Sequence, residues 1–116
     1  MGLDITLYKT KATKIADFRK VNFLFKFFED GIGENNPTTI EVTKEDLEDL
    51  RDRCSKVLLD HTLAETLLPT CPGFFFGSTE YDDGYFKDVL RVLDTCETLL
   101  KQPLDDEEGY ELYIWY

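Results

Sequence analysis

The stretch that decides the fold reads Leu68-Pro69-Thr70-Cys71-Pro72-Gly73-Phe74-Phe75-Phe76-Gly77-Ser78-Thr79-Glu80-Tyr81-Asp82-Asp83-Gly84-Tyr85-Phe86. Prolines and glycines on both sides of the three phenylalanines break a helix, so the phenylalanines are predicted to form a short extended segment that enters a polar turn. A helix is predicted after the turn, with Thr79 and Asp82 as its capping pair and Asp83 near the positive end of its dipole.

Two interpretations of this stretch stay open. In the first, a buried strand leads into a capped helix. In the second, the stretch is a binding loop, because side chains of an extended segment alternate between faces and three neighbouring phenylalanines cannot all enter one core. A phosphate-binding loop is disfavoured, since the lysine of such motifs is missing and Glu80, Asp82 and Asp83 would repel a phosphate.

Length and composition indicate one globular domain over residues 1–116. The chain has 116 residues, of which 42% are hydrophobic and 14% aromatic, enough for one conventional core. No apolar run is long enough to span a bilayer, and the N-terminus lacks the pattern of a signal peptide. A cytoplasmic protein without a membrane partner is therefore expected.

The charge is strongly negative and unevenly distributed. The net charge is −11, with +2 in residues 1–30 and −13 in residues 31–116. A field of this sign disfavours nucleic acid, anionic membranes and free phosphates as direct partners and favours basic ones. Two interpretations remain, a charge that keeps the protein soluble and a charge that imitates DNA.

A central helix is predicted from about Ile15 to Asp30, because apolar residues follow the helical period there. Its spacing places Arg19, Asn22 and Lys26 on one face. This polar line is either a solvated seam whose asparagine bonds to a neighbouring loop, or a contact for an anion with Arg19 as the donor.

The other elements follow from periodicity and caps. Strands are expected over Leu3–Tyr8, Thr39–Val42 and Tyr110–Tyr116. A helix should begin at Thr43, paired with Asp46 as its cap. The apolar positions of the two long helices are Leu47, Leu50, Cys54, Val57, Leu58, Tyr85, Phe86, Val89, Leu90, Leu93, Cys96, Leu99 and Leu100.

These elements predict an α+β fold. About three helices pack on a small antiparallel sheet that pairs the N-terminal strand with the C-terminal strand, since an isolated terminal strand would fray. A further helical turn is expected near Leu63 and Leu67, ending before Pro69.

Metal and cofactor sites are not predicted. The three cysteines form no Cys-x-x-Cys pair, and His61 is the sole histidine, better suited to a helix end than to catalysis. The acidic turn Asp105–Glu108 lacks the spacing of a calcium loop. We therefore expect no cofactor and no metal, and an enzyme is less favoured than a binding protein.

Several motifs resemble a family of small phage and prophage proteins of unassigned function. They are Met1-Gly2-Leu3-Asp4 with Leu7-Tyr8, Arg19-Lys20 followed by Asn22, Glu41-Val42-Thr43-Lys44-Glu45, and above all Leu68-Pro69-Thr70 through Gly73-Phe74-Phe75-Phe76-Gly77-Ser78-Thr79-Glu80-Tyr81-Asp82. The resemblance implies a role in phage and host conflict. Similar sequences commonly carry a histidine where this chain has Phe25, so it implies no acid or base from this helix.

Three functions follow as hypotheses. The first is a noncatalytic protein that docks onto a host protein with a basic surface, possibly as a DNA mimic that inhibits host defence. The second is a small-molecule or nucleotide-binding protein or enzyme with a pocket between the central helix and the loop. The third is an accessory domain. The candidate binding residues are Arg19, Asn22, Phe75, Ser78, Thr79, Glu80, Tyr81 and Asp82.

Overall fold

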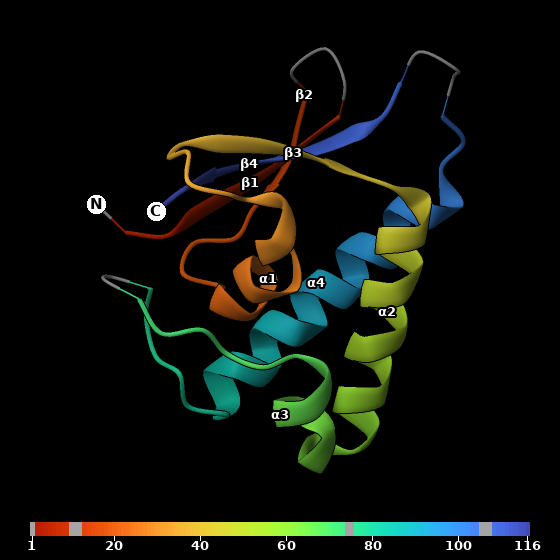
Figure 1. Ribbon diagram of the computed structural model, residues 1–116. Coiled ribbons are helices and arrows are strands. Elements are labelled where there is room, and N and C mark those ends of the chain that lie inside the picture. The colour runs from red at the N-terminus through yellow and green to blue at the C-terminus, as the bar shows by residue number, and fades with distance from the viewer. Residues whose placement is uncertain (1, 10–12, 74–75, 105–107) are drawn as a thin grey trace.

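The computed structural model describes residues 2–9, 13–73, 76–104 and 108–116. A four-stranded antiparallel sheet forms one side of it, and the helices lie on the other side (Figure 1). The strand order is β2-β1-β4-β3. The strands are β1 (Asp4–Lys9), β2 (Thr13–Asp17), β3 (Thr38–Val42) and β4 (Tyr110–Trp115). The pairing of β1 with β4 confirms that the two ends of the chain lie side by side in the sheet.

The register places one apolar row on the inner face of the sheet. Ile5 pairs with Ile114 and Leu7 with Leu112, and all four side chains are buried. Because side chains alternate along a strand, the intervening residues face outward, and Asp4 and Glu111 are exposed. The sheet thus has one covered face, as the alternation in the sequence predicted.

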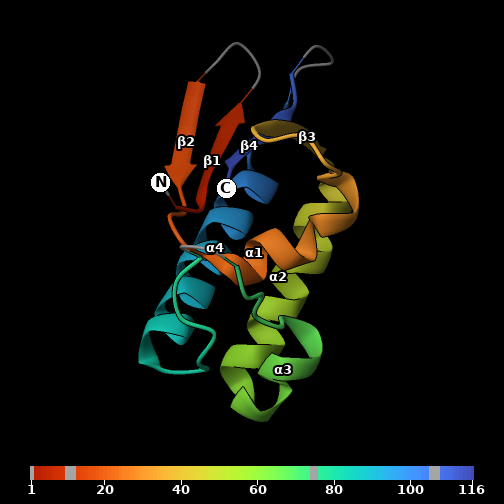
Figure 2. The same ribbon diagram turned by 60° about the vertical axis from the view of Figure 1, so that its left-hand side comes forward.

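The helices cover this inner face (Figures 1 and 2). They are α1 (Asn22–Phe27), α2 (Lys44–Leu59), α3 (Ala64–Leu67) and α4 (Asp83–Lys101), with 3-10 turns at Glu29–Gly31 and His61–Leu63. The antiparallel sheet with helices on one side confirms the predicted α+β class. The two long helices, α2 and α4, pack against each other, and each carries a buried cysteine, Cys54 in α2 and Cys96 in α4.

The predicted helix from Ile15 to Asp30 is wrong in its first half. Residues Thr13–Asp17 form strand β2 instead, because they bond to β1, and the pairing continues with Phe18 N–H donating to Ile5 O at 2.7 Å. Lys20 then adopts φ 59°, which ends the extended segment, and only Asn22–Phe27 is helical. Arg19 therefore precedes the helix and shares no helix face with Asn22 and Lys26.

The two long helices begin at different kinds of cap. Thr43 accepts from Asp46 N–H at 3.0 Å, and the Asp46 carboxylate accepts from Thr43 N–H at 3.0 Å, which confirms the predicted capping box. The predicted pair of Thr79 and Asp82 is wrong. Asp82 alone caps α4 by accepting from Tyr85 N–H at 3.0 Å, since the helix begins three residues later than Thr79 would require.

The apolar period of α4 was mostly predicted correctly. Tyr85, Val89, Cys96 and Leu99 are buried, whereas Leu90 is 50% exposed. Leu90 lies on the outer side of the helix, and Val92 occupies the inner side instead. The helix is covered along one stripe only, so an apolar residue beside that stripe stays in solvent.

Candidate functional site

Figures 1 and 2 show the course of the loop between α3 and α4. Asn22, the first residue of α1, fixes this loop to the body of the protein. Asn22 is 3% exposed, and it is the one buried polar residue identified among the described residues. Its Nδ2 donates to Phe76 O at 3.1 Å and to Ser78 O at 2.9 Å, and its Oδ1 accepts from Cys71 N–H at 3.1 Å. Asn22 thus holds both arms of the loop, as one of the two sequence interpretations proposed.

Aromatic packing closes the same loop from the other side. Phe76 is 6% exposed, and its ring contacts Phe25 at a centroid distance of 4.9 Å and Tyr116 at 6.3 Å. Gly73 allows this arrangement, because a Cβ there would lie 2.7 Å from the Phe76 ring. Phe76 is therefore a core residue. Phe75, predicted as a binding residue, lies with Phe74 outside the described residues.

The hydroxyl groups of the loop bond mainly within the loop. Thr70 Oγ1 donates to Thr79 O at 3.0 Å, and Tyr81 OH accepts from Thr70 N–H at 3.2 Å. Ser78 Oγ accepts from Glu80 N–H at 3.0 Å. These bonds stabilise the shape of the turn, and they assign Ser78, Thr79 and Tyr81 first of all to the support of the loop.

A hollow of about 290 Å³ lies between residues 19–23 and the start of α4. It brings together five of the eight predicted residues, and it adds residues that the sequence did not single out. The predicted members are Arg19, Asn22, Ser78, Glu80 and Asp82, and the added ones include Lys20, Tyr85 and Asp88. Thr79 and Tyr81 are not among its lining residues.

Three carboxylates give this hollow an acidic rim. Glu80 and Asp82 are exposed, and Asp88 is half-buried with Arg91 Nη1 3.8 Å from its Oδ1. Burial raises the pKa of the Asp88 carboxyl, Arg91 opposes the shift, and Asp82 adds to it. Arg19 lies at the edge, where its Nε is 3.9 Å from Asp4 Oδ1. With Lys20, the lining holds two cationic side chains against three carboxylates, and this excess of negative charge favours a cationic group over an anion.

Asp88 was not predicted as a site residue because it lies within a regular helix. It lies four residues after Gly84, so the two share one face of α4, and both line the hollow. That spacing, read together with the acidic residues before the helix, is the signal that would have identified it.

The groups that commonly perform catalysis are placed elsewhere. Burial raises the pKa of Cys54 and raises that of Cys96 to about 12, so both thiols are protonated at neutral pH. His61 stacks on Phe86 at a centroid distance of 3.7 Å, at the far end of α2. In the part of the chain that the structure describes, no group of three or more His, Cys, Asp or Glu residues has the arrangement of a metal site. The acidic turn Asp105–Glu108 lies mostly outside that part.

No protein-family model, no curated protein and no solved structure matches this chain. Among the described helices, none combines the length and apolar character that a membrane span requires.

Proposed function

We propose that this chain is a noncatalytic protein that docks onto a basic surface of another protein. The observation that carries the proposal is the hollow between residues 19–23 and α4, with Glu80, Asp82 and Asp88 at its rim. A lysine or arginine side chain of a partner would enter the hollow and face these carboxylates. Phe76 belongs to the core and is therefore not part of the proposed docking surface, whereas the binding role of Phe75 stays a prediction.

The overall charge supports a basic partner. A net charge of −11 on 116 residues steers a positively charged surface toward the protein and raises the rate of association at low salt. Specificity then needs a fixed local feature, and the Asn22 bonds and the Phe76 packing hold the loop that carries Glu80 in one place. A rigid rim loses little conformational entropy on binding.

The identity of the partner belongs to the same proposal. The resemblance to phage and prophage proteins favours a bacterial host protein, and the acidic surface favours one that normally binds nucleic acid, which this chain would imitate. Its own direct binding to nucleic acid is disfavoured by charge. A nucleotide in the hollow is disfavoured for the same reason, since the three carboxylates outnumber Arg19 and Lys20 in its lining.

The test is capture from a bacterial lysate at low and high salt, with mass-spectrometric identification and then measurement of affinity with the purified partner. Glu80→Gln with Asp88→Asn should weaken binding about tenfold at low salt, because both carboxylates are lost while the cap at Asp82 remains. Glu65→Gln with Asp94→Asn changes the net charge equally on exposed helix positions and should have a much smaller effect. Equal affinities of the two double variants would reject the hollow as the docking point, and binding of nucleotides by the wild-type protein would favour the small-molecule alternative.

A further inference from the structure

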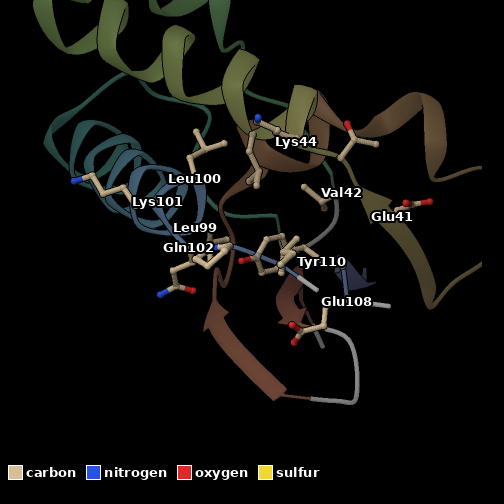
Figure 3. Close-up of a pocket in the computed structure, with 14 residues that line it drawn as sticks. Glu41, Val42, Lys44, Leu99, Leu100, Lys101, Gln102, Glu108 and Tyr110 are labelled. Carbon is tan, nitrogen blue, oxygen red and sulfur yellow. The ribbon is translucent and has the colours of Figure 1, made fainter. Parts of the chain in front are cut away.

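A larger hollow lies at the opposite end of the sheet, where α2 begins and α4 ends (Figure 3). Its volume is about 590 Å³. In the register of the sheet, Tyr110 stands between Lys9 of β1 and Val42 of β3, in the last row of the inner face. The hollow forms because the helix ends meet this row at its edge, and residues of both helices line it.

About half of the lining of the hollow is apolar, and this part is formed by aliphatic side chains and the ring of Tyr110. Val42, Leu47 and Leu99 are buried and Leu100 is half-buried, while Leu104 is 40% exposed at the opening. Figure 3 shows Leu99, Leu100 and Val42 around the ring of Tyr110. Such walls gain free energy when an apolar group displaces water from them.

Tyr110 adds one polar atom to this apolar surrounding. The residue is 3% exposed, and among the described residues its hydroxyl is the buried side-chain polar atom that has no hydrogen-bond partner. Figure 3 shows the hydroxyl on the side of the α4 end. A buried hydroxyl without a partner lowers stability, so its presence here requires an explanation. Burial raises the pKa of Tyr110, which keeps the phenol protonated and able to donate.

The described charged groups around the hollow are either paired or lie at its rim. Lys9 Nζ lies 2.9 Å from Glu108 Oε2, so these two groups neutralise each other beside Tyr110. Among the other described lining residues, Glu41 stands against Lys44 and Lys101. In Figure 3 the ends of Lys101 and Glu41 point away from the ring of Tyr110. A ligand with a net charge would therefore lose hydration without gaining a counter-ion in the interior.

We propose that this hollow binds a small, neutral, mainly aliphatic molecule that accepts a hydrogen bond from the hydroxyl of Tyr110, with a carbonyl oxygen as the simplest acceptor. The hydroxyl is covered in the present structure, so binding moves a lining side chain aside. The site is separate from the acidic hollow and does not depend on the proposed docking function.

The test uses three probes of equal chain length, namely 2-octanone, octanoate and octylammonium, titrated into the full chain and followed by amide chemical shifts. We expect 2-octanone to shift amides of β3, the start of α2 and the end of α4, and to bind at least about tenfold more tightly than either charged probe. Tyr110→Phe should weaken 2-octanone about fivefold, since one hydrogen bond is lost. Tyr113→Phe, on the outer face of the same strand, should leave its affinity unchanged.

A second variant tests the cavity itself. Leu100→Trp should fill the hollow and abolish the shifts, whereas Leu90→Trp, at an exposed position of the same helix, should preserve them. A cooperative thermal unfolding transition of each variant would show that it folds. The proposal is overturned if 2-octanone causes no shifts at these amides, if Tyr110→Phe binds it as tightly as the wild type, or if a charged probe binds equally well.

Discussion

The two ends of the molecule each bury a polar side chain beside a hollow, and they treat it in opposite ways. At the loop end, Asn22 makes three hydrogen bonds to backbone groups of residues 71–78. At the other end, the hydroxyl of Tyr110 has no partner among the described residues. Burial of a polar group alone thus says little about function. A buried polar group that makes all its hydrogen bonds holds segments of the structure together. One that lacks a partner can still donate a hydrogen bond to a ligand.

Two buried tyrosines sharpen the same contrast. Tyr85 is 6% exposed and its hydroxyl donates to Leu68 O at 2.8 Å, whereas Tyr110 is 3% exposed and donates to no described group. Their burial is nearly equal, so any difference in what their hydroxyls contribute comes from the hydrogen bond.

The largest expected effect comes from removing the hydrogen bonds of Asn22. Asn22→Leu keeps the approximate shape of the side chain but leaves Cys71 N–H, Phe76 O and Ser78 O without their partner. We expect a loss of about 3 kcal/mol in the free energy of unfolding, measured with urea. Asn35→Ala, at an exposed loop position, should cost less than about 0.5 kcal/mol. Equal costs for the two variants would contradict this role of Asn22.

The next largest effect is a difference in stability between two tyrosine variants, Tyr85→Phe and Tyr110→Phe. Tyr85→Phe is expected to lose about 1 kcal/mol, because the hydroxyl bond is removed and Leu68 O is left unpaired. Tyr110→Phe should be neutral or stabilising, since it removes a buried hydroxyl that has no bond. Thermal and urea unfolding of both variants provide the measurement. A larger loss for Tyr110→Phe than for Tyr85→Phe would reverse the comparison.

Removing either helix cap should lower the free energy of unfolding by a similar amount. Thr43→Ala and Asp82→Ala each remove a side-chain acceptor at the start of a long helix, and about 1 kcal/mol is expected from either. Thr43→Ser keeps the acceptor and should recover most of the loss. Hydrogen exchange should show faster opening at the first turn of α2 in Thr43→Ala and of α4 in Asp82→Ala. Faster opening of both helices in each variant would show that the ends are not independent.

The smallest expected effect is the pH dependence of stability that Asp88 causes at the acidic hollow. Burial raises the folded-state pKa of Asp88, so the folded protein binds this proton more tightly than the unfolded chain does. The contribution of Asp88 to stability is therefore least favourable at neutral pH and improves as pH falls toward the ordinary carboxyl pKa of about 3.9. The stability difference between wild type and Asp88→Asn, measured from pH 7 to pH 4, should shift in favour of the wild type. A constant difference would contradict the raised pKa.

Local patterns in the sequence were enough to predict most of the fold. The alternation in Leu3–Tyr8, the capping box at Thr43 and Asp46, and the period from Tyr85 to Leu100 were each determined by neighbours close in sequence. The helix predicted over residues 15–30 was wrong in its first half because β2 depends on hydrogen bonds to β1 and ends at the positive φ of Lys20. The helical period of the phenylalanines gave no sign of either feature. Tertiary pairing there outweighed local propensity.

The candidate site was predicted in part for the same reason. Loop residues close in sequence, such as Ser78, Glu80 and Asp82, line one hollow, and Arg19 and Asn22 line it too. The bonding state of each group depends on contacts between distant segments, such as Asn22 with Ser78, and no local pattern reveals it. Tyr110 was not predicted as a site residue because its sequence context is that of an ordinary strand. The hollow beside it arises from the way two helix ends meet the sheet.

The claim that the acidic hollow receives a basic partner is tested most directly by the salt dependence of affinity. For the captured partner, the dissociation constant should rise steadily with salt for the wild type, and Glu80→Gln with Asp88→Asn should weaken binding at low salt and flatten that rise. Affinities of the wild type and this double variant that coincide at every salt concentration would contradict the account.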